Sequence, residues 1–200
     1  MMRNKLLKIL SAAVMLVTTA TSQASEIGAE YQTYKSGDGK NFFADFDLKY
    51  GLKVNVGFSN IKLEGDQQVR AIARMKYLEY GVGYNYNLVK GIDVYANISK
   101  GKITFDDNSI VVVSGEEKAV IAANDIKGYE YKLGVKYRFL KDYEIDIKGK
   151  VIDYKNMDSV ETFLVTTSYY LTKSFKINAT YADNSLVNES SYNVGLSYNF

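Results

Sequence analysis

The chain has 200 residues, 25 Lys and Arg against 23 Asp and Glu, and no His, Cys, Pro or Trp. The lack of His and Cys removes the commonest general base, thiol nucleophiles, disulfides and thiolate metal sites. An average protein contains about 5% proline, so its absence here suggests that nearly all backbone N–H groups are committed to a hydrogen-bonded ladder. These features disfavour most enzymatic chemistry, and the sequence predicts no catalytic, cofactor or metal site.

Residues 1–24 have the three parts of a secretory signal peptide. Their start is basic and carries no acid, residues 9–17 are apolar, and a polar stretch ends in Ser22-Gln23-Ala24. The apolar run is shorter than the roughly 20 residues that a membrane-spanning helix needs. Cleavage after Ala24 would leave residues 25–200 as one domain with nearly balanced charge, so no basic patch predicts nucleic-acid binding.

Apolar and polar residues alternate along nearly all of the remaining chain. Between residues 129 and 139 the odd positions hold Tyr, Leu, Val and Phe, whereas the even positions hold Glu, Lys, Gly and Arg. Segments 42–52 and 78–86 show the same alternation. Because successive side chains of a strand point to opposite faces, this pattern predicts long β-strands. Turn signals divide the chain into ten of them: 26–35, 42–52, 53–63, 74–87, 91–104, 128–139, 143–154, 160–171, 175–183 and 190–200.

The length of these segments favours a membrane barrel over a soluble sandwich. Strands of soluble proteins usually have about 5–6 residues, whereas a membrane-crossing strand needs about 9–11 and must belong to a closed barrel. Four breaks are short and contain Leu closely followed by Lys, and the others are longer, polar and variable. Short turns on one side and longer loops on the other are typical of outer-membrane barrels. We therefore expect an all-β, closed, antiparallel up-and-down transmembrane barrel of ten strands, with eight as the alternative.

The end of the chain carries the most specific motif. Asn193, Gly195, Tyr198 and Phe200 follow the spacing polar, x, Gly, x, x, aromatic, x, aromatic. This segment resembles the outer-membrane β-signal, and the resemblance implies recognition by the barrel-assembly machinery. Across the mature chain the pattern is similar to the small OmpA/OmpX-type barrels. The sequence departs from such barrels in lacking Trp, so Tyr and Phe are expected to form the aromatic girdles.

The polar face of the predicted strands is rich in charge. Asp45 and Asp47 could form a paired-carboxylate site, but a barrel interior is polar and its charges usually pair with one another. The two signs are nearly balanced, so a lumen filled by its own side chains is the expected state. The predicted inward-facing charges are Glu30, Asp45, Asp47, Lys49, Glu79, Asp93, Glu130, Lys132, Lys136, Arg138, Glu144, Asp146, Lys148, Lys150 and Lys176.

The favoured function is that of an integral outer-membrane protein of a Gram-negative cell, structural or surface-interacting (adhesion-type) through its outer loops. The loop at 106–127 contains two apolar runs around a Gly-containing turn, which predicts a hairpin able to bind an extracellular ligand or to stiffen the wall. The alternative is a narrow porin-like channel for small solutes. A barrel enzyme is the least favoured class, because no histidine is present to activate a nucleophile. The expected partners are outer-membrane lipid and the assembly machinery.

The terminal motif generates the first prediction. If Phe200 completes the assembly signal, Phe200→Asp lowers the amount of folded protein in the outer membrane while secretion across the inner membrane continues. Fractionation and immunoblotting of wild type and variant measure both steps. Normal levels of folded variant protein in the outer membrane would show that this motif is not the signal.

Overall fold

The computed structural model of the protein describes residues 25–35, 37–64, 72–105, 125–154, 159–184 and 189–200. Ten strands account for nearly all of these residues. In chain order the strands are β1 (Glu26–Tyr34), β2 (Gly37–Asp47), β3 (Leu52–Glu64), β4 (Ile72–Val89), β5 (Ile92–Phe105), β6 (Ile126–Phe139), β7 (Tyr143–Tyr154), β8 (Val160–Tyr170), β9 (Phe175–Asn184) and β10 (Glu189–Asn199). No helix among these residues is long and apolar enough to cross a membrane.

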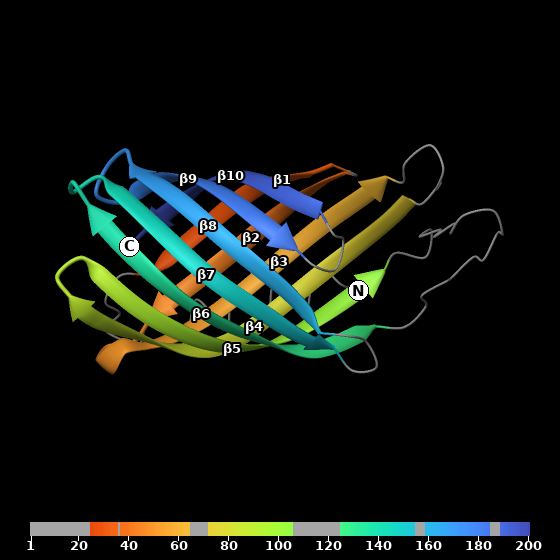
Figure 1. The fold of residues 1–200 in the computed structure, drawn as a ribbon, viewed down its shortest axis with the longest axis horizontal. Helices are drawn as coiled ribbons and strands as arrows, with labels where there is room; N and C mark the ends of the chain where they lie inside the picture. Colours follow the sequence, from red (N-terminus) through yellow and green to blue (C-terminus); the bar gives the residue numbers. More distant parts are fainter. Residues whose placement is uncertain (1–24, 36, 65–71, 106–124, 155–158, 185–188) are drawn as a thin grey trace.

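The strands form one closed barrel in which each pairs antiparallel with its neighbours in sequence, and β1 pairs with β10 (Figure 1). The closing register runs from Glu26 opposite Asn199 to Tyr34 opposite Ser191. Ser25 and Phe200 extend this seam, because the N–H of each donates to the carbonyl of the other at 3.0 and 2.9 Å. The predicted ten-stranded up-and-down barrel is therefore confirmed, and the eight-stranded alternative is wrong.

The predicted alternation separates an apolar outer face from a polar lumen. Leu133, in the middle of β6, has 65% of its surface exposed on the outer face, while Glu130 on the same strand points inward and is fully buried. Along β10, Tyr192, Val194 and Leu196 are each about 60% exposed. This apolar exterior around a polar interior is the reverse of the arrangement in a soluble barrel, and a surrounding bilayer requires it.

The two ends of the barrel differ as the turn pattern predicted. The turns after β2, β4, β6 and β8 are tight and lie at the end that also holds Ser25 and Phe200 (Figure 1). Three of them use residues in the left-handed backbone region: Tyr50 with φ +64°, Gly91 with φ +87° and Leu140 with φ +48°. The connections after β3 and β5 leave from the opposite end. By the outer-membrane pattern the tight turns mark the periplasmic end.

One predicted strand is wrong at both of its ends. The segment expected as a strand over 42–52 starts earlier, at Gly37, and ends at Asp47, and a short 3₁₀ turn follows over Lys49–Gly51. Tyr50 adopts a φ of +64° in this turn, which interrupts the alternation that continues in the sequence. Lys49 is consequently exposed in the turn, and its prediction as an inward-facing charge is wrong.

Two lumenal glycines make room for neighbouring side chains. A Cβ on Gly81 would lie 2.3 Å from Ser99 Oγ and from the Ile98 carbonyl oxygen. A Cβ on Gly134 would lie 2.4 Å from the ring of Tyr95, which crosses over this position toward β7. A side chain at either position would collide with these neighbours, so the close filling of the lumen requires glycine there.

On the outer face of the barrel, the cost of an added charge depends on its depth in the membrane. Leu133→Arg places a guanidinium on the lipid face near mid-membrane, and we expect it to lower the free energy of unfolding by about 2–4 kcal/mol. The control is Thr33→Arg, which adds the same group on the outer face near the loop-bearing end of β1, where the cost falls to about 0–1 kcal/mol. Urea unfolding of protein refolded in lipid vesicles measures both. Equal losses would mean that lipid does not surround Leu133.

Candidate functional site: a charged lumen

The charged side chains of the lumen are segregated around the barrel wall. Strands β1 and β2 present only acids among their lumenal ionisable groups: Glu26, Glu30, Asp45 and Asp47. The bases concentrate on β6, β7 and β9, where Lys132, Lys136, Arg138, Lys148, Lys150 and Lys176 point inward. A few acids lie among the bases and organise them into clusters.

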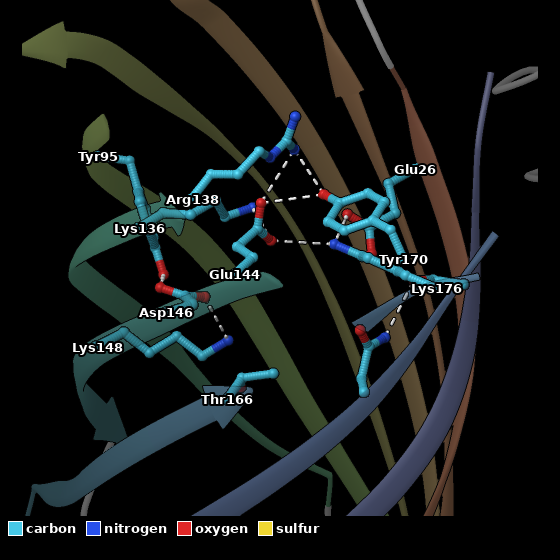
Figure 2. Close-up of polar contacts among 12 residues, drawn as sticks. Glu26, Tyr95, Lys136, Arg138, Glu144, Asp146, Lys148, Thr166, Tyr170 and Lys176 are labelled. Atoms are coloured by element: carbon cyan, nitrogen blue, oxygen red, sulfur yellow. Dashed lines mark hydrogen bonds and ion pairs between the residues drawn. The ribbon is translucent and has the colours of Figure 1, made fainter. Parts of the chain in front are cut away.

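Glu144 is the centre of the larger cluster, near the periplasmic end (Figure 2). One carboxylate oxygen accepts from Arg138 at 3.1 Å and from the Tyr170 hydroxyl at 3.0 Å, and the other lies 3.3 Å from Lys176 and 3.6 Å from Lys136. Only 2% of Glu144 is exposed. A buried carboxylate is stable when it is paired and hydrogen-bonded. Here one carboxylate holds three cations, two from β6 and one from β9.

Lys176 connects this cluster to the acidic wall. Its ammonium group also binds Glu26 of β1 at 3.0 Å, so it bridges β7 and β1 across the lumen. The guanidinium of Arg138 lies over the ring of Tyr170, 4.7 Å from its centroid. Arg138, Glu144 and Tyr170 are thus held together both by this cation–π contact and by charge-assisted hydrogen bonds.

A second cluster surrounds Glu130 further toward the outer end. Glu130 binds Lys132 at 2.6 Å and Lys150 at 3.3 Å, and it accepts a 2.7 Å hydrogen bond from the Tyr77 hydroxyl. Lys132 also binds Glu79 on β4 at 2.9 Å. The cluster therefore joins β4, β6 and β7 through side chains that reach past the strand between them.

A smaller group lies between the two clusters. Asp146 accepts from the Tyr95 hydroxyl at 2.7 Å, and Lys148 lies 3.5 Å from its other oxygen (Figure 2). Lys148 keeps 26% of its side chain exposed, about the same fraction as Lys136 in the Glu144 cluster.

Two cavities follow one another along this lumen. One of about 220 Å³ lies in the middle of the barrel and reaches Glu79 and Lys150. The other, of about 270 Å³, lies at the periplasmic end and reaches Asp47 and Tyr170. Since the share of liquid volume per water is about 30 Å³, each can hold several water molecules. Their shared lining comprises two acids from one wall and two bases from the other: Glu26, Asp45, Lys136 and Lys176.

The outer part of the lumen has a different character. Ile103, Ile152, Tyr154 and Val160 form a buried apolar cluster on the inner side of β5, β7 and β8. It lies on the loop side of the Glu130 cluster, because these residues occupy the ends of their strands away from the tight turns. The aqueous space of the middle lumen is therefore bordered by apolar side chains on this part of the wall.

The lumenal charges were predicted largely correctly from alternation. Sequence reasoning missed Glu26 and Lys53, because both stand next to a strand end, although they have the same parity as Glu30 and Asn55. Lys53 lies 3.3 Å from Asp47. Asp45 and Asp47 both face the lumen. Because Asp47 forms an ion pair with Lys53, the structural interpretation is favoured over a paired-carboxylate site.

The predicted assembly signal falls on the closing strand. Asn193 and Gly195 face the lumen, whereas Tyr198 and Phe200 face outward and stack with centroids 6.2 Å apart. Their role as a signal stays a prediction. The loop predicted to bind an extracellular ligand, 106–127, lies mostly outside the described residues, which resume at Asp125.

Comparisons with known proteins identify the type of fold. No known protein family and no curated protein matches the sequence. Among solved structures, KdgM porin is similar with a TM-score of 0.52 and 16% identity, over 88% of this chain and 99% of that one. NanC porin gives 0.49 with 11% identity over 87% and 98%, and the N-terminal β-barrel domain of Pseudomonas aeruginosa OprF gives 0.43 with 13% over 90% and 100%. The fold is that of outer-membrane β-barrels.

Glu144 generates a stability prediction. Glu144→Gln keeps the shape but removes the charge that holds three cations, and we expect the free energy of unfolding to fall by about 3 kcal/mol. The control is Glu30→Gln, since Glu30 accepts one amide hydrogen bond from Asn41 at 3.1 Å and should lose about 1 kcal/mol or less. Urea unfolding in vesicles compares the two. A loss at Glu30 as large as that at Glu144 would mean that the cluster is not a principal stabilising contact.

Proposed function

We propose that the protein is a narrow, water-filled channel of the outer membrane that passes small ions and solutes of a few non-hydrogen atoms. The observation that carries the proposal is the pair of charged cavities in series, which share Glu26, Asp45, Lys136 and Lys176 at their boundary. These four groups form the narrow passage of the proposed channel. Acids on one side and bases on the other create a field across the path of a permeating ion.

The proposal reverses the order of the two functions expected from sequence. A lumen filled completely by its own side chains would favour a structural or surface-interacting barrel, whereas space for water along the charged wall favours the channel. The similarity of the fold to KdgM porin supports the same choice. At 16% sequence identity this similarity concerns the fold and does not identify the solute. The OmpA/OmpX-type refinement and the adhesion role have no support from the described residues.

Several further features belong to the same proposal. The chain reaches the outer membrane of a Gram-negative cell by secretion with residues 1–24 as its signal peptide, and its tight turns face the periplasm. It has no enzymatic activity, because no His is available as an activating base and the carboxylates of Glu130 and Glu144 are already engaged in ion pairs. The outer loops set access to the lumen from outside.

Single-channel recording in planar bilayers tests the proposal. We expect steady, reproducible openings of small conductance in potassium chloride. Asp45→Arg introduces a long cation between the two cavities, beside Lys136 and Lys176, and should reduce the potassium current several-fold. Thr33→Arg adds the same group on the outer face and should leave the current unchanged.

Electrical silence of the folded wild-type protein would contradict the channel and restore the filled barrel with a surface role. Equal currents in the wild type and Asp45→Arg would show that ions do not pass between the two cavities. The folded state of each sample is established beforehand by its resistance to SDS without heating, so a silent sample is not mistaken for an unfolded one.

A further inference from the structure

The four tight turns at one end of the barrel carry the same two types of side chain (Figure 1). Each exposes a lysine and, within two residues of it, a large apolar side chain. The apolar members are 87%, 57%, 76% and 54% exposed in chain order. The four pairs are Tyr50 with Lys49, Leu88 with Lys90, Leu140 with Lys141, and Leu171 with Lys173.

Two of these turns hold such side chains in a backbone conformation that favours glycine. Tyr50, Leu140 and Lys141 have φ values of +64°, +48° and +48°, and they are the non-glycine residues with positive φ in the described part of the chain. Glycine adopts this conformation freely, whereas a residue with a Cβ is strained in it. Residues under such strain cluster at functional sites. The choice of residues therefore points to a role for these side chains beyond reversing the chain.

The four lysines have no partners within the described chain. All are exposed, and none forms an ion pair or a side-chain hydrogen bond with another described residue. Asp142 is the one acid among the described residues of these turns. Even if a terminal carboxylate on Phe200 is counted as a second acid, the lysines outnumber the acids.

Other acids do not neutralise the turns. Residues 1–24, which precede β1, contain no Asp or Glu, and the remaining segments outside the described residues join the strands at the opposite end of the barrel. The nearby acids that face the lumen are engaged elsewhere. Glu26 binds Lys176, Asp47 binds Lys53, Asp93 accepts from Asn87, and Glu144 binds Arg138.

The turn lysines lie just beyond the outward aromatic residues of the same end. Along β4 the outward Tyr86 and Leu88 are each 57% exposed, and Lys90 follows. Along β8 Tyr169 precedes Lys173 in the same way. Tyrosine at the edge of an apolar band marks the membrane–water interface. A lysine at that level lays its methylene stem along apolar surface and extends its ammonium group to the headgroups.

We propose that these four turns bind anionic phospholipids of the periplasmic leaflet. The lysines contact the headgroup phosphates, and the apolar side chains beside them enter the adjoining part of the acyl-chain layer. Electrostatic attraction and apolar insertion reinforce each other at a membrane surface. A soluble anion or the cell wall would leave Tyr50 and Leu140 in water, so their exposure favours lipid. The proposal rests on the outer-membrane location and orientation in the proposed function, but not on ion conduction.

Native mass spectrometry of the purified protein in detergent tests this contact. The protein is titrated with dioleoylphosphatidylglycerol, which is anionic, and with zwitterionic dioleoylphosphatidylcholine. We expect the wild type to bind the anionic lipid more tightly, and Lys90→Gln/Lys141→Gln to bind it about tenfold more weakly than the wild type does. The matched control is Lys40→Gln/Lys100→Gln, which removes two exposed lysines from the opposite end and should bind as the wild type does.

Equal losses in the turn variant and the control would show attraction by net charge alone and would overturn the proposal. A wild type that does not distinguish the two lipids would do the same. Leu140→Ser/Leu171→Ser keeps every charge and should bind both lipids several-fold more weakly, so unchanged binding by this variant would contradict insertion. Loss of sedimentation with purified peptidoglycan in Lys90→Gln/Lys141→Gln, with its lipid binding unchanged, would assign the turns to the cell wall instead.

The orientation has its own test. Because the chain has no cysteine, Lys141→Cys places a single thiol in one turn. A membrane-impermeant maleimide should label it only after the outer membrane is permeabilised, and labelling in intact cells would overturn the assignment to the periplasmic leaflet. Folding of each variant is monitored by gel mobility without heating. Failure of the channel appears separately, as silence in planar bilayers, so it is not confused with failure of the lipid contact.

Discussion

The pairing of β1 with β10 is the contact on which the rest of the structure depends. Hydrocarbon offers no hydrogen-bond partners, and each unpaired backbone N–H or C=O in it costs several kcal/mol. The nine residue pairs from Glu26–Asn199 to Tyr34–Ser191 leave neither strand as an open edge. The absence of proline from the chain agrees with this requirement, because a proline in any ladder would remove a donor. Once the ladder is closed, each strand has one face for lipid and one for the lumen.

Closure also explains why the lumen contains ion clusters. Charged residues that alternate with lipid-facing ones are brought into a confined interior, where they are stable only with partners or water. Glu144 gathers cations from β6 and β9, Glu130 gathers them from its own strand and from β7, and Lys176 extends the first cluster to Glu26 on the opposite side of the closing seam. The unequal distribution of acids and bases around the wall leaves them facing one another across two cavities, and this separation is the physical basis of the conducting passage that we propose.

The sequence predicted the features that depend on local pattern. Alternation around Leu133 and Lys132 identified the lipid and lumen faces, and the short breaks around Leu140 and Lys173 identified the end with tight turns. The pattern could not reveal which charges meet, because Lys132 and Glu79 come from strands that are not neighbours, and their approach depends on the register and curvature of the closed wall. Lys49 was misplaced because the turn at Tyr50 reverses the chain while the sequence continues to alternate. Assigning each charge to its strand in the sequence would have revealed the acidic β1–β2 wall, but its position opposite the bases required the closed barrel.

The most direct test of the central claim, a closed barrel in the outer membrane, is electrophoretic mobility with and without heating. Membrane fractions are dissolved in SDS and run before and after boiling. A closed barrel resists SDS at room temperature, because its ladder has no edge at which unfolding can begin, and it changes mobility when boiling unfolds it. The account predicts such a shift for protein recovered from the outer-membrane fraction. A protein found in the soluble fraction, or one with the same mobility before and after boiling, would contradict it.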